Sequence, residues 1–405
     1  MPSVARRWTM LILAFLTALT LHLLLFSYSP LVPEVISEMG LSHTQAGLIF
    51  SICILTITVF RIPWGILSDR IGFVATMRLA MIFIATFGLL RGVVGGYEAL
   101  LALQSLLGIG FAAILPCLPK LVDAYFPSRA GFATGAYVAG FPIGEMVGLS
   151  LTPQLLALTG DWRRIFGIFG ICGLILAILW WMVAKEPTRN EHALMFEMSS
   201  PPSFREGLAN AVRVREVWVL TGLCIISMGS YDATVLWLPT MLEYRGISQA
   251  MAGLMASILP LGFLCAGPVI GSASDRAGLR RPFIWALGFI GGLSILAIGL
   301  GSGPLLLIAI FLTGLCLTGI LTLVLVIPTE LAEISGFVGS TVGIVSSFGN
   351  FGSLLMPITI GYVKDATGSF LPAVIMLAAV AEMTLILGLV LRETGRAEGE
   401  RYSIP

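Results

Sequence analysis

The sequence predicts an all-α membrane protein with twelve transmembrane helices in two pseudo-symmetric six-helix bundles. Composition is the first observation, since 57% of the 405 residues are hydrophobic and only 11% are charged, against about 25% charged residues in soluble domains. Two further observations are a series of long apolar runs and an internal repeat at one fixed spacing. A chain of this kind needs lipid as its solvent.

The apolar runs have the length of membrane-spanning helices. A bilayer core requires about 20 apolar residues per helix, and no long alternating pattern typical of barrel strands competes with this interpretation. The expected spans are 9–33, 44–68, 74–95, 98–120, 132–157, 163–184, 216–241, 248–273, 281–301, 304–328, 337–362 and 370–392. The first run is too long for a signal peptide and is followed by further spans, so we interpret it as a retained helix.

Charge asymmetry predicts the orientation. With both termini in the cytoplasm, the outer loops hold only Arg163, Arg164, Arg245 and Lys364 of the 23 Lys and Arg residues. Two more, Arg61 and Arg91, fall within spans, and all the others lie on the inner side. This excess follows the positive-inside rule. We therefore expect a multi-pass protein of the cell membrane, plasma or inner, with cytoplasmic termini.

An internal repeat divides the chain into halves. Gly40–Ser42 recurs as Gly246–Ser248, and Ser68–Arg70 recurs as Ser274–Arg276, always 206 residues later. A fixed offset over more than 30 residues indicates parallel repeats related by an axis along the membrane normal. We expect an N-terminal bundle over 1–184, a proline-containing cytoplasmic linker over 185–215, and a C-terminal bundle over 216–405 that ends in a short cytoplasmic tail.

Several function classes are excluded or disfavoured by what the sequence lacks. The net charge of +1 gives no indication of nucleic-acid binding. The histidines and cysteines show no metal-ligand spacing and no CxxC pair, so we expect neither a metal nor another cofactor. There is no G-x-x-x-x-G-K-[ST] loop, HExxH or GxSxG, so a self-contained ATP-driven pump is excluded and an enzyme is disfavoured.

Two loops carry a resemblance to a known family. Gly65–Gly72 and Gly271–Arg281 lie after the second and eighth spans. They resemble the G-x-x-x-D-R-x-G-R-R loop of the major facilitator superfamily, and the similarity of topology covers nearly the whole chain. The first copy departs from the pattern, because Phe73 and Val74 replace the terminal basic pair and Arg78 is the candidate for that charge.

The repeated loop predicts a gate. A glycine near the helix end lets a neighbouring helix approach closely, a second glycine permits the tight turn, and the aspartate can interact with a helix N-terminus or a basic side chain. Such contacts can form in one conformation and break in another; the alternative is a turn with anchoring charges. The expected gating residues are Gly65, Asp69, Arg70, Gly72, Gly271, Asp275, Arg276 and Gly278.

Arg61, in the second span, is the foremost candidate for substrate binding. Charge within a span is functional by default. The run Arg61–Pro63 is similar to the arginine-bearing span of nitrate/nitrite porters, but the repeat-equivalent residue is Gly267 instead of a second arginine. A single guanidinium can still clamp a carboxylate or another small anion. The alternative is a structural ion pair with Glu145 or Asp232.

Other polar residues in spans are weaker candidates. Asp232 and Glu145 are the expected proton-coupling groups, because a buried carboxyl can titrate near neutral pH. The expected substrate contacts besides Arg61 are His22, Tyr28 and Asn350, although a lone histidine is more often a core residue and an asparagine can simply join helices.

Two charged residues lie in spans that the resemblance places away from the central cavity. Arg91, in the third span, and Glu382, in the twelfth, are expected to be structural, with the Arg91 side chain extended to the membrane surface. The fourth span has Gln104 where proton-coupled members of the family often have arginine, so the resemblance supplies no relay arginine there.

Together these features predict a secondary active transporter. We expect a monomer that works by alternating access and imports a small organic or inorganic anion with a proton. A proton-driven exporter of hydrophobic or cationic compounds is the nearest alternative, with Glu145 and Asp232 attracting the cargo. A membrane sensor that binds a ligand without moving it is the second alternative, disfavoured by the lack of a long soluble domain.

Overall fold

The computed structural model describes residues 4–186, 210–331, 334 and 337–395. Within these ranges the chain is helical and has no β-strand. Twelve helical spans in the described residues are long and apolar enough to cross a membrane, which confirms the predicted number and order. The observed helices extend beyond most predicted spans, because polar residues at their ends continue the helix outside the apolar run.

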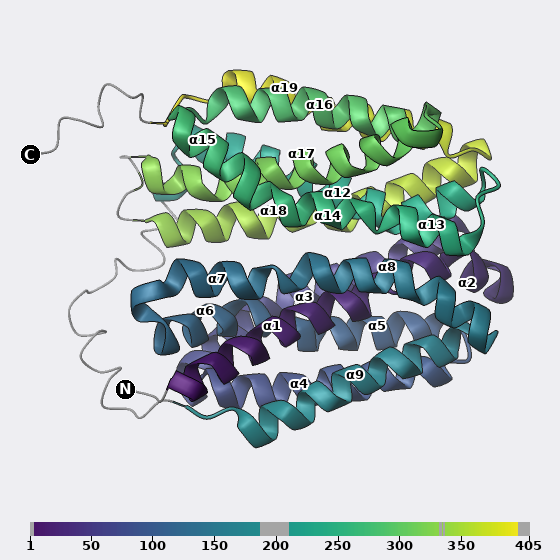
Figure 1. The fold of residues 1–405 in the computed structure, drawn as a ribbon, viewed down its shortest axis with the longest axis horizontal. Coiled ribbons are helices and arrows are strands. Elements are labelled where there is room, and N and C mark those ends of the chain that lie inside the picture. The colour runs from purple at the N-terminus through teal and green to yellow at the C-terminus, as the bar shows by residue number, and fades with distance from the viewer. Residues whose placement is uncertain (1–3, 187–209, 332–333, 335–336, 396–405) are drawn as a thin grey trace, which may run out of the picture. The chain divides into compact units, whose positions relative to one another are not determined.

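The described chain folds into two compact units. The first unit contains the described residues up to 186 together with Leu238–Ser257. Its elements are α1 (Val4–Phe26), η1 (Ser29–Leu31), α2 (Val32–Met39), α3 (His43–Ile71), α4 (Phe73–Leu90), η2 (Arg91–Val93), α5 (Tyr97–Phe111), α6 (Ile114–Tyr125), η3 (Pro127–Arg129), α7 (Ala130–Val138), α8 (Gly140–Thr159), α9 (Trp162–Val183) and α13 (Gln249–Ala256). In Figure 1, α4 lies along α9.

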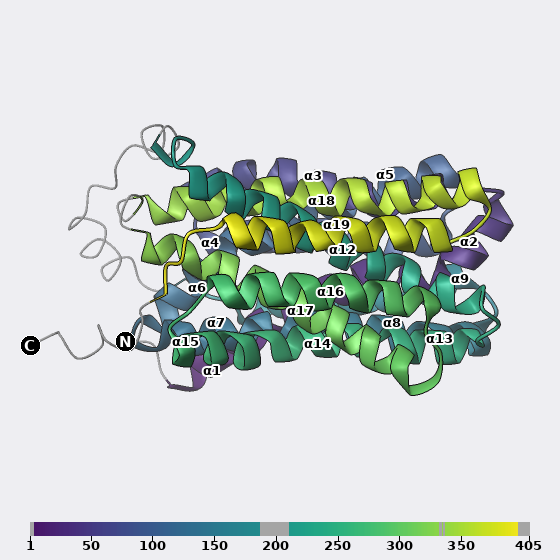
Figure 2. The ribbon, with the colours of Figure 1, turned by 90° about the horizontal axis from the view of Figure 1, so that it is seen from above.

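The second unit contains the rest of the described chain. Its elements are most of α12 (Arg215–Glu243), α14 (Ile258–Ala266), η4 (Gly267–Gly271), α15 (Ser272–Ala277), α16 (Arg281–Leu300), α17 (Gly303–Glu330), α18 (Val338–Thr367) and α19 (Leu371–Val390). Helix α16 packs along α19, and α14 packs along α17 (Figure 2). By its contacts Leu238–Ser257 belongs to the first unit. Most of the predicted linker lies outside the described residues, and the predicted domain boundaries stay predictions.

Local sequence signals explain where helices begin and end. The Ser42 hydroxyl accepts from the Gln45 backbone N–H, and the Gln45 side chain accepts from the Ser42 N–H, so a capping box starts α3. Gly72 and Gly278 end α3 and α15 with φ of 88° and 64°, a region that favours glycine. Both tight turns predicted from the repeated loop are therefore confirmed.

The spans in the two units are not regular throughout. Residues 267–271 form a short π-helical turn between α14 and α15. Pro268 has no backbone N–H and cannot continue the α-helical bonding, which accounts for a turn of this kind. The repeat-equivalent stretch around Arg61 stays within the continuous helix α3, even though it contains Pro63. The two halves therefore differ in backbone geometry at this repeated position.

Glycines bring repeat-equivalent pairs of helices into close contact, α1 with α8 in the first unit and α12 with α18 in the second. A Cβ at Gly144 of α8 would overlap the Leu19 carbonyl oxygen of α1, and a Cβ at Gly352 of α18 would overlap the Ile225 carbonyl oxygen of α12. Leu19 and Ile225 are repeat equivalents. Such close approach allows extensive van der Waals contact, which drives helix association where the surrounding solvent is also apolar.

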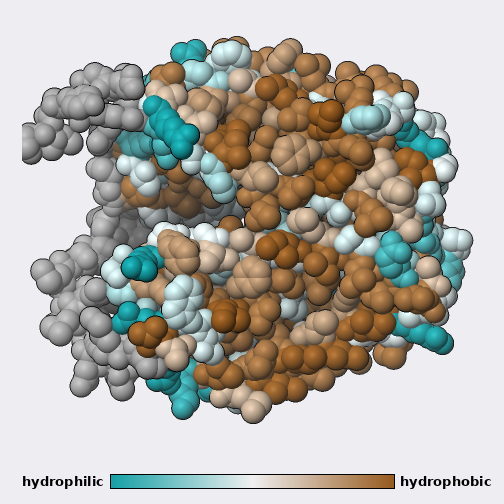
Figure 3. All heavy atoms as spheres, in the orientation of Figure 1, coloured by the Kyte–Doolittle hydropathy of each residue, from teal (hydrophilic) through white to brown (hydrophobic). Residues whose placement is uncertain are grey.

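The surface agrees with a bilayer setting. On the face in Figure 3, hydrophobic side chains cover the middle of the helices, and hydrophilic side chains gather near the helix ends. Large apolar side chains such as Ile62, Leu158 and Met182 are exposed on the surface. Exposure of this kind is favourable in a bilayer, because lipid is then the solvent.

The close helix contacts give a stability prediction. We expect Gly144→Val and Gly352→Val each to destabilise the fold by about 1–3 kcal/mol or more, because the added side chain must push two backbones apart. Gly135→Ala is the matched control, since a Cβ at Gly135 meets no atom within 4 Å. Thermal unfolding of the purified protein measures the effect. An unchanged midpoint in both valine variants would contradict this packing.

Candidate functional site

A histidine and a glutamate meet inside the first unit. Nδ1 of His22, on α1, lies 3.2 Å from Oε2 of Glu145, on α8. The Glu145 side chain is fully buried, whereas 19% of the His22 side chain is exposed. The sequence indicated each residue separately, and the structure shows that they form one pair.

The α1–α8 crossing positions this pair. Gly140 and Gly144 allow α8 to touch the backbone of α1, which places Glu145 directly beside it. The His22 ring packs between Phe26 and Phe141, with ring centroids 5.1 and 4.8 Å away. A partly exposed imidazole that contacts a buried carboxylate can receive and pass a proton.

Arg61 is half-buried and lies on the face of α3 that also carries the buried Ile57, Trp64 and Ser68. Nε1 of Trp64 donates to the Ile109 carbonyl of α5 at 2.7 Å, which fixes the rotation of this face. Nε of Arg61 is buried and has no hydrogen-bond partner among the described residues. Glu145 faces His22 in the same unit, and the alternative of a structural ion pair for Arg61, with Glu145 or Asp232, stays a prediction.

The remaining predicted contacts lie in different surroundings. Tyr28 is fully buried, and its hydroxyl donates to the Ala46 carbonyl at 3.0 Å, so it joins the end of α1 to α3. Asp232, on α12, is half-buried, and Asn350, on α18, is 6% exposed. Both belong to the second unit, whereas Arg61 belongs to the first. Their assigned roles stay predictions.

Asp69 is held at the end of α3 by a lysine from α6. Nζ of Lys120 lies 2.5 Å from both Asp69 Oδ1 and Ser68 Oγ. Lys120 could not be predicted as the partner from the sequence, because 51 residues separate it from Asp69. Arg78 does not supply the missing loop charge; it donates instead to carbonyls at the end of α9, including Ala184 O at 2.7 Å.

Asp275 is held differently, by an arginine in its own loop. Nη2 of Arg280 lies 2.7 Å from Asp275 Oδ1 and 2.7 Å from Glu330 Oε1 at the end of α17. Hydrogen bonding to Glu330 raises the pKa of Arg280 above its ordinary value, and the bond to Asp275 adds to this against the opposing effect of burial. Glu393, after α19, accepts from the backbone N–H of Arg280 at 2.7 Å.

The other loop residues have simpler surroundings. Arg70 and Arg276 are exposed. A Cβ at Gly65 or Gly271 would meet its nearest neighbour at 3.8 Å, an ordinary contact. The structure therefore does not support the expectation that these two glycines permit an unusually close helix approach; Gly144 and Gly352 do so instead.

The expectation that the Arg91 side chain extends to the membrane surface is wrong. Its side chain is fully buried and does not extend to the membrane surface. Nη1 donates to the Leu24 carbonyl and to Gln104 Oε1, and the guanidinium lies 4.5 Å from the centroid of the Phe166 ring. These contacts turn the side chain inward from the end of α4. Glu382 packs beside Gly292, between α19 and α16.

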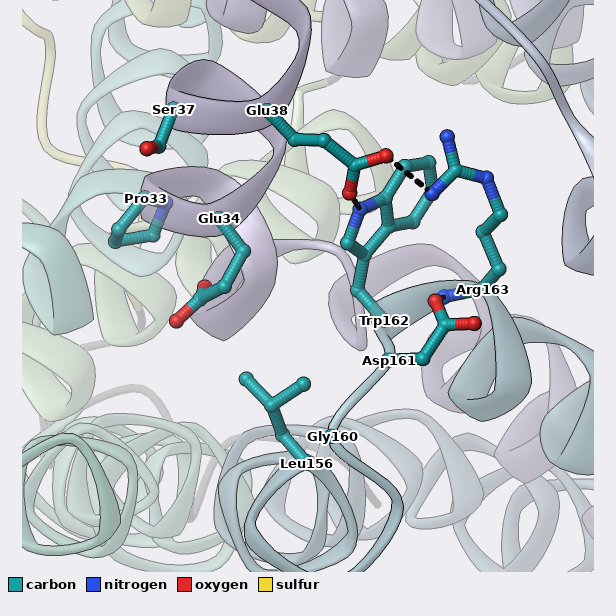
Figure 4. Close-up of a pocket in the computed structure, with 9 residues that line it drawn as sticks. All are labelled: Pro33, Glu34, Ser37, Glu38, Leu156, Gly160, Asp161, Trp162 and Arg163. Carbon is teal, nitrogen blue, oxygen red and sulfur yellow. Dashed lines mark hydrogen bonds and ion pairs between the residues drawn. The ribbon is translucent and has the colours of Figure 1, made fainter.

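A hollow of about 680 Å³ opens at the other end of the first unit, between α2 and the α8–α9 turn (Figure 4). Across it, Glu38 accepts from Trp162 Nε1 at 2.6 Å and pairs with Arg163 at 2.6 Å. None of the predicted site residues lines this hollow. On α2, Glu34 accepts a hydrogen bond from Gln249 of α13, which joins Leu238–Ser257 to this unit.

Comparison with known proteins supports the fold and the class. The family model described as Major Facilitator Superfamily matches residues 10–248 and 220–402. The chain is 27% identical to the "Probable galactarate/D-glucarate transporter" of Bacillus subtilis, covering 87% of this chain and 85% of that protein. It is 24% identical to the D-galactonate transporter of Escherichia coli, covering 93% of each.

A third relative is named for an inorganic anion, nitrate or nitrite. The chain is 26% identical to the "Probable nitrate/nitrite antiporter" of Thermus thermophilus, covering 82% of this chain and 79% of that protein. Among solved structures, a bacterial homolog to the human lysosomal transporter Spinster, inward-facing and unoccupied, has a TM-score of 0.74 at 17% identity and covers 96% of each chain, which supports the fold. The chain belongs to the Major Facilitator Superfamily and is one of its transporters, not an enzyme.

Proposed function

We propose that this transporter imports a small organic acid anion, of the sugar-acid class, together with a proton. The observation that carries the proposal is Arg61, whose Nε is buried in a membrane-spanning helix without a protein partner among the described residues. A guanidinium presents parallel donors that match a carboxylate. Two of the relatives reported above are named for sugar acids, one as a probable galactarate/D-glucarate transporter and one as a D-galactonate transporter, which supports a carboxylate as the ligand.

A sugar acid suits this chain better than nitrate. The repeat position equivalent to Arg61 is Gly267, which lies in the π-helical turn, so the second unit contributes no matching guanidinium there. One arginine can hold the carboxylate, and hydroxyl groups of the sugar chain need only neutral polar partners. Asn350, whose amide is neutral, is the proposed residue for such a contact.

The His22–Glu145 pair is the proposed coupling site. His22 is partly exposed and Glu145 is closed, so a proton would enter at the imidazole and be stabilised by the carboxylate. Asp232 is the second proposed coupling group. Moving an anion with at least one proton reduces the net charge carried through the bilayer, which lowers the electrostatic barrier.

Alternating access is proposed to use the two repeated loops. Asp69–Lys120 and Asp275–Arg280–Glu330 are charged contacts at helix ends, with the carboxylates of Asp69 and Asp275 exposed. Contacts of this kind exchange more easily than packed cores, because water can replace each partner. We propose that they stabilise one conformation of a monomer in the cell membrane, with both termini cytoplasmic.

Substitution of Arg61 tests the substrate proposal. In proteoliposomes with an inward proton gradient, we expect uptake of a labelled sugar acid such as D-galactonate or D-glucarate, with nitrate as a comparison. Arg61→Ala should lower uptake at least about tenfold, since a charge-assisted bond contributes about 1.5–3 kcal/mol. Arg61→Lys should retain part of it, because it keeps the charge but loses the fork geometry.

The matched control is Arg164→Gln. The Arg164 side chain is 68% exposed, so its substitution should leave uptake unchanged. Uptake by Arg61→Ala equal to wild type would show that Arg61 does not bind the substrate. Efflux of hydrophobic cations by the wild type, without uptake of any acid, would favour the exporter alternative.

Substitution of the His22–Glu145 pair tests the coupling proposal. We expect Glu145→Gln and His22→Gln to lose accumulation driven by the proton gradient while exchange of labelled for unlabelled substrate continues, because only the proton step is removed. Glu382→Gln, a carboxyl beside Gly292 in the other unit, is the control. Proton-driven accumulation that survives in both pair variants would rule out this pair as the coupling site.

A further inference from the structure

A buried donor cluster in the first unit includes neither Arg61 nor the His22–Glu145 pair. Arg91 is 0% exposed and Gln104 is 1% exposed. Nη1 of Arg91 donates to the Leu24 carbonyl at 3.1 Å and to Gln104 Oε1 at 3.2 Å. The guanidinium lies over the Phe166 ring. The cluster therefore joins α1, η2, α5 and α9.

This cluster has donors without acceptors. Nε and Nη2 of Arg91 and Nε2 of Gln104 are buried, and none has a hydrogen-bond partner in the part of the chain that the structure describes. No carboxylate in that part forms an ion pair with Arg91. A buried guanidinium without a counter-charge is strongly unfavourable, and buried polar groups in native proteins are almost always satisfied.

We propose that the Arg91–Gln104 cluster binds one small inorganic anion of the halide class, represented by chloride. Every unpartnered group is a donor, so the missing partner must be an acceptor. An anion supplies both the acceptor and the charge that Arg91 lacks. A water molecule supplies an oxygen, but it brings no charge and adds two hydrogens that need acceptors of their own.

The packing beside Arg91 favours a small ion over a sugar acid. A Cβ at Gly92 would lie 3.0 Å from the Gly167 Cα, and a Cβ at Gly170 would lie 2.8 Å from the Gly88 backbone. The segments that carry Arg91 and Phe166 therefore touch backbone to backbone. A spherical ion held there ties α1 and α5 to this contact and acts as a fixed part of the bundle, separate from the transported solute.

Halide-dependent thermal unfolding tests this site. The purified full-length protein is heated in sodium chloride, sodium bromide or sodium gluconate at equal ionic strength. Since a ligand that binds only the folded state raises stability by mass action, we expect a saturable rise in the midpoint of roughly 2–5 °C in either halide. Gln104→Leu should weaken the response and Arg91→Met should remove it, whereas Arg164→Gln, at an exposed arginine, should keep it.

Two results would overturn the proposal. One is an equal midpoint in halide and gluconate for the wild type; the other is an undiminished halide response in Arg91→Met. If Arg91→Met does not fold, crystals grown in bromide decide the question. An anomalous peak in contact with Arg91 and Gln104 supports the site, and an ordered water there without anomalous signal shows that solvent satisfies these donors instead.

Discussion

A charged side chain inside a bilayer-spanning bundle needs a partner, and this constraint organises the first unit. Glu145 is closed off from solvent but meets His22, and Arg91 meets the Leu24 carbonyl, Gln104 and the Phe166 ring. Where the described protein supplies no partner atom, as at Arg61 Nε, the constraint points to something that is not part of the chain.

Helix contact makes these pairings possible. His22 and Glu145 are 123 residues apart, and they meet because Gly140 and Gly144 let α8 touch the backbone of α1. The second unit has the same contact between Gly352 and Ile225 without a repeated histidine–glutamate pair. The repeat has kept the packing of the two halves alike, while the polar chemistry has diverged between them.

The two repeated loops show the same separation of shape and partner. Gly72 and Gly278 adopt positive φ and make equivalent turns. Asp69 is neutralised from α6 by Lys120, whereas Asp275 is neutralised from within its loop by Arg280, which also bonds to Glu330. Val74 stands at the repeat position of Arg280, and in the first copy a lysine from another helix provides the charge.

The sequence by itself determined the spans, their order, the repeat and the two tight turns. Span length, apolar composition and glycine at a positive-φ turn are local properties that need no tertiary information. It also indicated His22, Glu145 and Arg61 as unusual polar residues. Only the tertiary structure decided that His22 pairs with Glu145, that Lys120 holds Asp69, and that Arg91 turns inward. A membrane span is apolar on all sides, so its sequence carries little information about helix rotation, and rotation decides which distant side chains meet.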